Sequence, residues 1–98
     1  MRNVKSTEAF KAQLAALFDR HGYVRRLNPK RRAKDGPTYK KGDEIRLVAR
    51  TLDDVVRIAR WVRRAGFEPG RPFAKAQQFV LPIYGLEEVA RFLKFIGR

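Results

Sequence analysis

Hydrophobic residues in this chain recur with two different periods, and the alternation between these periods limits the folds that it can adopt. Helical spacing predicts three helices with capping residues at their ends. The first begins at Ser6 or Thr7 as N-cap and runs to about Arg20, the second has a capping-box-like start at Thr51 to Asp54 and ends before Gly66, and the third runs from Leu86 to about Ile96. Gly22 is typical of the left-handed glycine that follows a helix.

Strand-like segments between the helices predict two hairpins. The first pairs Tyr23 to Leu27 with Tyr39 to Arg50, whose regular part is Glu44 to Arg50, and the second leads from Phe67 through Ala76 into a strand from Gln77 to Tyr84. Pro69, Pro72 and Pro82 indicate irregular or edge positions in the second hairpin. The element order αββαββα predicts an α+β domain with an antiparallel four-stranded sheet, its helices on one face and the other face free.

Alternation assigns the strand residues to the two faces of this sheet. Those expected to face the helices are Ile45, Leu47, Ala49, Phe79, Leu81 and Ile83, and those expected on the free face are Glu44, Arg46, Val48, Arg50, Gln78, Val80 and Tyr84.

The apolar stripes of the helices predict the residues that cover the sheet. They are Phe10, Leu14, Leu17 and Phe18 in the first helix, Leu52, Val55, Ile58, Ala59 and Val62 in the second, and Leu86, Val89, Leu93 and Ile96 in the third. Trp61 is expected at the edge of the core with Arg57 and Arg64 stacked on its ring. Phe95 points away from its stripe, which leaves a partner contact or an end-packing contact as alternatives.

The charge of the chain restricts its partners. A formal charge of +13 on 98 residues gives a surface that attracts polyanions. The segment from Arg20 to Arg50 holds eleven Lys or Arg against three acidic residues, so it is the predicted contact region. Cysteine is absent and no apolar run reaches transmembrane length, so we expect a cytoplasmic protein without membrane contact.

One short segment resembles a known signature. Leu14 to Tyr23 reads Leu-Ala-Ala-Leu-Phe-Asp-Arg-His-Gly-Tyr, which is similar to the motif of the LAGLIDADG homing endonucleases. That family shares the element order predicted above. The resemblance implies a sheet saddle across the DNA major groove and two motif helices that meet at the centre. A chain with one motif must form a homodimer to complete this arrangement.

The resemblance and the basic segments together define two sets of candidate residues. Small side chains let helices approach closely, so the dimer interface is predicted at Ala9, Ala12, Ala15, Ala16 and Asp19; the alternative is that these alanines are simply good helix formers. The candidate DNA contacts are Arg25, Arg26, Lys30, Arg31, Arg32, Lys40, Lys41, Arg46, Arg50, Arg71, Lys75 and Gln78.

The motif departs from the family at its catalytic position. In the family a carboxylate directly precedes the motif glycine and holds divalent metal, whereas here His21 precedes Gly22. Neutral imidazole is a poor ligand for Mg²⁺, so we expect no cofactor and no ordinary cleavage. An altered endonuclease, with Asp19 or His21 recruited to Mg²⁺, stays as an alternative. Otherwise Asp19 has a helix-end or interface role, and His21 contacts DNA or packs at the helix end.

These features predict a non-catalytic, homodimeric protein that binds double-stranded DNA and is nucleoid-associated. A second alternative is an RNA-binding module, such as a splicing or ribosome-associated factor. Exposed aromatic side chains that stack on unpaired bases would favour RNA. Tyr23, Tyr39 and Tyr84 are the residues that distinguish these alternatives.

Overall fold

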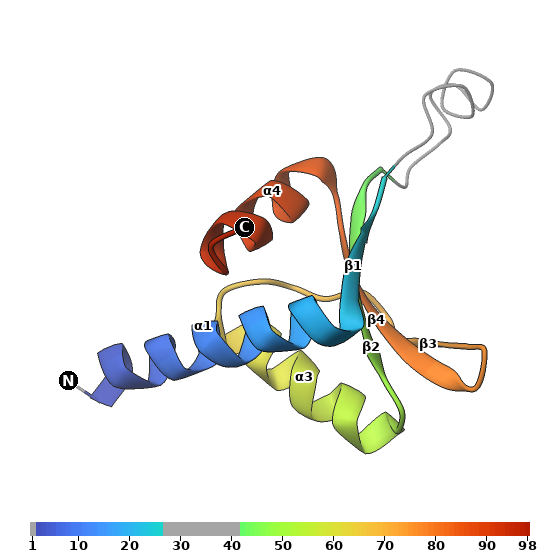
Figure 1. Cartoon of the computed structure of the whole chain (residues 1–98), viewed down its shortest axis with the longest axis horizontal. Coiled ribbons are helices and arrows are strands. Elements are labelled where there is room, and N and C mark those ends of the chain that lie inside the picture. Colours follow the sequence, from blue (N-terminus) through green and yellow to red (C-terminus); the bar gives the residue numbers. More distant parts are fainter. Residues whose placement is uncertain (1, 27–41) are drawn as a thin grey trace.

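The computed structural model describes residues 2–26 and 42–98, and side chains from residue 9 onward. Four antiparallel strands form one sheet in the order β1-β2-β4-β3. All three described helices lie on the same side of this sheet, as Figure 1 shows. The α+β fold and the element order αββαββα predicted from periodicity are therefore confirmed.

Apart from the start of α1, the element bounds lie close to those that the hydrophobic periods predict. They are α1 (Arg2–His21), β1 (Gly22–Arg25), β2 (Glu44–Ala49), α3 (Leu52–Arg64), β3 (Phe73–Lys75), β4 (Gln78–Tyr84) and α4 (Leu86–Phe95). The predicted basic loop, with Lys30, Arg31, Arg32, Lys40 and Lys41, lies outside the described residues, as do Leu27 and Tyr39.

The start of α1 was predicted incorrectly. The helix begins at Arg2 and continues through Ser6 and Thr7, which therefore do not cap it. A serine or threonine inside a helix costs roughly 0.5 kcal/mol relative to alanine. This cost is too small to force the helix to begin after these residues. α1 consequently has 20 residues, and its N-terminal turns extend beyond α3 and α4 in Figure 1.

Gly22 does not act as the left-handed cap that the sequence suggested. Its φ is not among the positive glycine values, and it is already the first residue of β1. A Cβ added at Gly22 would lie 2.9 Å from both Cα and Cδ1 of Phe18 and 3.1 Å from Cδ2 of Leu47. Glycine is therefore required here because α1 turns directly into the sheet at very close range.

The core fills the space between the sheet and the helices. Leu14 and the inward residues of β2 are buried, together with Leu81 and Ile83 of β4 and with Val55, Ile58, Ala59 and Val62 of α3, while Phe79 of β4 is partly buried. Leu52 and Leu86, both predicted to be in the core, are 55% and 63% exposed. Each is the first residue of its helix and projects beyond the packed layer. Phe92, which the predicted stripe omitted, is fully buried in α4.

Aromatic rings close the core between the helices. Phe92 lies 6.2 Å from Phe18 and 5.4 Å from Phe67, and Phe95 lies 5.8 Å from Phe67, all measured between ring centroids. These edge and tilted contacts are the favourable geometry for aromatic pairs. Phe95 thus makes the end-packing contact that the sequence left open.

Arginine contacts around α3 differ in part from the prediction. Thr51 caps the helix as expected, with its Oγ1 accepting the N–H of Asp54 at 3.1 Å. Trp61 packs against the core as a half-buried residue. Arg64, however, stacks on Phe10 of α1 at 4.9 Å from the ring centroid rather than on Trp61. The spacing of residues within α3 does not indicate this contact, because Phe10 belongs to α1.

The irregular second hairpin predicted from its prolines is confirmed. β3 has three residues and joins β4 through a two-residue turn, in which Ala76 and Gln77 have φ values of 51° and 66°. Pro82 lies in β4 beyond the end of β3, where its carbonyl accepts the N–H of Gly70 at 2.7 Å. The proline nitrogen points to that same edge, so β4 loses no strand hydrogen bond.

Candidate nucleic-acid interface

The sheet face opposite the helices carries most of the predicted contact residues that the structure describes. Antiparallel register places Tyr23 beside Arg46 and Arg25 beside Glu44, and β3 adds Phe73 and Lys75 near the start of β4. Because side chains alternate along each strand, these residues share one face. We call it the open face, and it comprises Tyr23, Arg25, Glu44, Arg46, Val48, Phe73, Lys75, Gln78, Val80, Pro82 and Tyr84.

A buried carboxylate organises two arginines of the open face. Glu44 is 1% exposed and accepts from Nη1 of Arg25 at 3.2 Å through Oε1 and from Nε of Arg46 at 2.9 Å through Oε2. A carboxylate in this position needs such partners, because burying it unpaired is costly. Both guanidinium groups are consequently held in fixed orientations on the sheet.

Arg46 is also held from two other directions. Its Nη1 donates to the Tyr23 hydroxyl at 3.4 Å, and its guanidinium carbon lies 5.2 Å from the Phe73 ring centroid. Burial opposes the charge of Arg46, but its hydrogen bonds to Tyr23 and Glu44 raise its pKa above the usual value. The Arg46 hydrogen bond in turn lowers the pKa of the Tyr23 hydroxyl, and the charge of Lys75 acts in the same direction.

The open face is less solvated than alternation predicted. Glu44 and Val80 were expected on a free surface but are buried, and the side chain of Arg46 is only 13% exposed. Part of the cause is the segment before β3, in which Gly70 hydrogen-bonds to the edge of β4 and lies close to the side chains of Tyr84 and Pro82. A Cβ at Gly70 would overlap Cε2 of Tyr84 and lie 3.2 Å from Cγ of Pro82, so this backbone fits there only as glycine.

The remaining predicted DNA contacts are distributed around this face. Arg71 is exposed in the segment before β3, next to the exposed open-face residues Lys75 and Gln78. Arg26 follows β1 and forms an ion pair with Asp43, with Nη1 of the arginine 2.7 Å from Oδ2 of the aspartate. Arg50 follows β2 and lies near the foot of α1 rather than on the sheet face.

The predicted dimer residues lie along α1. Ala9, Ala12 and Ala16 are exposed, whereas Ala15 is partly buried against the core because it lies next to Leu14 on the helix. Asp19 forms an ion pair with Arg98, whose Nε donates to Oδ1 at 3.0 Å and whose Nη2 donates to Oδ2. This hydrogen bonding, which outweighs desolvation, lowers the pKa of Asp19. This contact is of the helix-end kind that the sequence offered as one alternative, and the interface role of Asp19 stays a prediction.

His21 is exposed at the foot of α1. Within residues 2–26 and 42–98, no group of three or more His, Cys, Asp or Glu side chains is placed to hold a metal ion. No helix in these ranges is long and apolar enough to cross a membrane.

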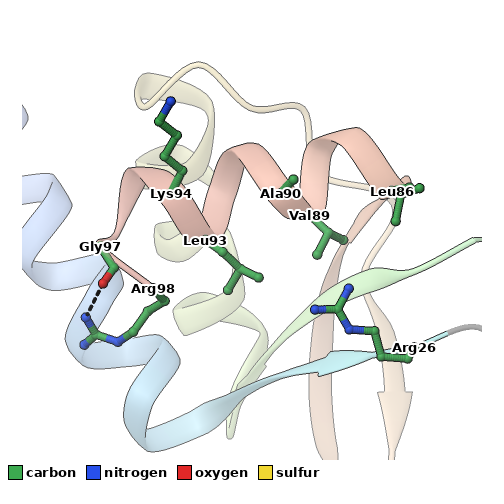
Figure 2. Close-up of a pocket in the computed structure, with 8 residues that line it drawn as sticks. All are labelled: Arg26, Leu86, Val89, Ala90, Leu93, Lys94, Gly97 and Arg98. Carbon is green, nitrogen blue, oxygen red and sulfur yellow. Dashed lines mark hydrogen bonds between the residues drawn. The ribbon is translucent and has the colours of Figure 1, made fainter.

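Two of the hollows formed by residues 2–26 and 42–98 are large enough for a small molecule. One, of about 550 Å³, lies between α4 and the end of β1, and its wall includes Val89, Ala90 and Leu93 with Arg26 and Arg98 at the rim. Figure 2 shows these residues and the bond from Arg98 to the Gly97 carbonyl. The other, of about 470 Å³, lies at the foot of α1 and includes His21.

Sequence reasoning missed two parts of the site, the buried position of Glu44 and the ring of Phe73 over Arg46. The sequence did contain a signal for the buried position of Glu44. Glu44 lies two residues before Arg46 and therefore on the same face of the strand, and the strand predicted to pair with it carries Arg25. Comparison with known proteins identifies no relative, since no family model, curated protein or solved structure matches the chain.

Proposed function

We propose that this protein binds double-stranded DNA as a homodimer, with the open face of its sheet against the nucleic acid. The observation that supports this most is the set of fixed cations on a face that none of the described helices covers (Figure 1). Arg25 and Arg46 are held by Glu44, and Arg71 and Lys75 stand exposed beside them.

Preorganised guanidinium groups suit a phosphate backbone. An arginine that is already oriented loses little side-chain entropy on binding, and its planar fork matches phosphate oxygens and base edges. With a net charge of +13, long-range attraction to DNA adds to these contacts. The exposed residues Lys75 and Gln78 would supply contacts to phosphate and to a base edge, respectively.

The experiment compares two cationic faces of the same molecule. A labelled duplex is titrated by fluorescence anisotropy with the unaltered protein, with Arg71→Gln/Lys75→Gln, and with the matched control Arg60→Gln/Arg63→Gln on the outer side of α3. We expect the sheet variant to bind more weakly and to reduce the salt slope by about 0.9 for each lost phosphate contact. The control removes the same charge and should retain more affinity.

An equal loss of affinity in both variants would contradict the proposal, because DNA binding would then depend on net charge alone and not on the open face. The bound complexes, incubated with Mg²⁺, also test the altered-nuclease alternative. Specific cleavage that is abolished in Asp19→Asn or His21→Ala would replace our proposal with that one.

One observation favours a second candidate, the binding of single-stranded RNA. Tyr23 is 40% exposed on the open face beside Arg46, and an aromatic ring on a basic sheet is a stacking platform for unpaired bases. Tyr84 is half-buried beneath the Gly70 segment and offers less ring surface. Tyr23→Leu should then weaken binding of a single-stranded oligonucleotide about tenfold while leaving duplex binding unchanged.

A further inference from the structure

The hollow at the foot of α1 exists because β1 is shorter than its neighbour. β1 pairs with β2 only as far as the Gly22–Leu47 position, whereas β4 pairs with β2 up to Ala49. Among the described strands, nothing lies beside Val48 and Ala49 on the β1 side. The end of α1, the first turns of α3 and the start of β4 surround this space of about 470 Å³. That volume is within the usual range for small-molecule sites.

The walls of this cavity, which we call the foot cavity, divide into an apolar part and a charged part. Leu17, Val48, Ile58 and the half-buried ring of Trp61 supply the apolar part. The polar lining residues are His21, Arg50, Asp54, Arg57 and Gln78.

The cations of the foot cavity outnumber its carboxylates. Asp54 is the only lining carboxylate, and its Oδ1 is 3.7 Å from Nη1 of Arg57. No ion pair joins Arg50 to any other described residue, so its charge is available at the cavity mouth. The cavity therefore offers a net positive charge beside an indole ring.

We infer that the foot cavity binds a nucleoside monophosphate. Arg50 and Arg57 would hold the phosphate, because guanidinium groups form paired, charge-assisted hydrogen bonds with phosphate oxygens. The base would lie against Trp61 and the neighbouring aliphatic wall, and the Gln78 amide, which both donates and accepts, would bond its edge. Arg50, predicted from the sequence as a DNA contact, thereby belongs to the foot cavity, whereas Gln78 lines this cavity and also belongs to the open face.

This inference does not depend on duplex binding by the open face. The ligand is either a free nucleotide or the 5′-phosphorylated end of a strand, and both present the same phosphate and base. The chain has one tryptophan, so the indole N–H signal of Trp61 in a proton–nitrogen NMR spectrum reports directly on the cavity.

The experiment titrates AMP into the unaltered protein and into Arg50→Gln, Arg57→Gln and the matched control Arg60→Gln, which lies on α3 outside the cavity. We expect a saturable shift of the Trp61 indole signal, weakened about tenfold or more in the first two variants and unchanged in the control. Adenosine and inorganic phosphate should each bind more weakly than AMP. Comparing a 5′-phosphorylated with a 5′-hydroxyl oligonucleotide then identifies a strand end as the source.

Three results would overturn the inference. They are the absence of a saturable shift up to about 10 mM AMP, an equal response to adenosine, and an equal loss of affinity in Arg60→Gln and Arg50→Gln. A failure of duplex binding would leave these titrations unaffected, because Arg71 and Lys75 do not line the foot cavity. The two proposals are therefore tested separately.

Discussion

Gly22 is the residue with the least free space at the junction of helix and sheet. We expect Gly22→Ala to lower the free energy of unfolding by about 1–3 kcal/mol, because a methyl group would press on the Phe18 backbone and on Leu47. Urea denaturation measures this loss. Gly42→Ala is the matched control, since the nearest atom to its added Cβ is 4.0 Å away. Equal stability of both variants would show that α1 can move away from β1 without cost.

The ion pair between Asp19 and Arg98 predicts a pH dependence. Hydrogen bonding to Arg98 holds the pKa of Asp19 below its ordinary value of 3.8 in the folded protein. The pair therefore stabilises the fold above that value, and its contribution is lost as the pH falls through the lowered pKa.

We expect the Asp19 side-chain carboxyl signal in a carbon NMR titration to have its midpoint below 3.8. Arg98→Gln should return the midpoint towards that value, whereas Arg91→Gln, which removes another arginine of the same α4 region, should not. An unchanged midpoint in Arg98→Gln would show that the two side chains do not pair in solution.

Residue roles were only partly predictable from the sequence. The helical faces of α1 and α3 follow from spacing, so Leu14 and Val55 were placed correctly. Glu44 was assigned to a free surface because alternation gives the direction of a side chain but not what packs above it. The contact between Asp19 and Arg98 joins distant parts of the chain, and no local pattern indicates it.

At the scale of elements, α1 carries the proposed dimer interface. Ala12 and Ala16 are exposed on it, and small side chains allow a second helix to approach closely. We expect Ala12→Trp to separate the subunits, which sedimentation velocity measures. Ala90→Trp is the control, because Ala90 is also an exposed alanine but lies on α4. If only Ala90→Trp separated the subunits, the interface would lie on α4 instead of α1. If the unaltered protein were a monomer, the proposed dimer would be contradicted.

Element boundaries were predicted best where a side chain caps the backbone. Thr51 marks the start of α3 in both sequence and structure, because its hydroxyl satisfies a free helix N–H. The start of α1 was wrong by several residues, since neither Ser6 nor Thr7 interrupts the helix. Helix propensity alone does not determine where a helix begins when the residues near its start differ little in propensity.

For the whole molecule, hydrophobic period was sufficient to predict the αββαββα order and the one-sided arrangement of helices. Net charge indicated a polyanionic partner but not its binding face, because arginines lie on the outer side of α3 as well as on the sheet. The foot cavity could not be predicted, since it depends on β1 ending before β2 does. Such differences in strand length arise from tertiary packing rather than from the local sequence.

The turn between β3 and β4 has a consequence for the order of folding. Ala76 and Gln77 both adopt left-handed φ values, which cost residues with side chains about 1 kcal/mol or more each relative to glycine. A turn of this kind does not nucleate a hairpin, so we expect β3 to join only after β4 has paired with β2. Ala76→Asn/Gln77→Gly should accordingly slow unfolding in stopped-flow measurements and leave the folding rate unchanged. Faster folding of this variant would instead place the hairpin in the folding nucleus.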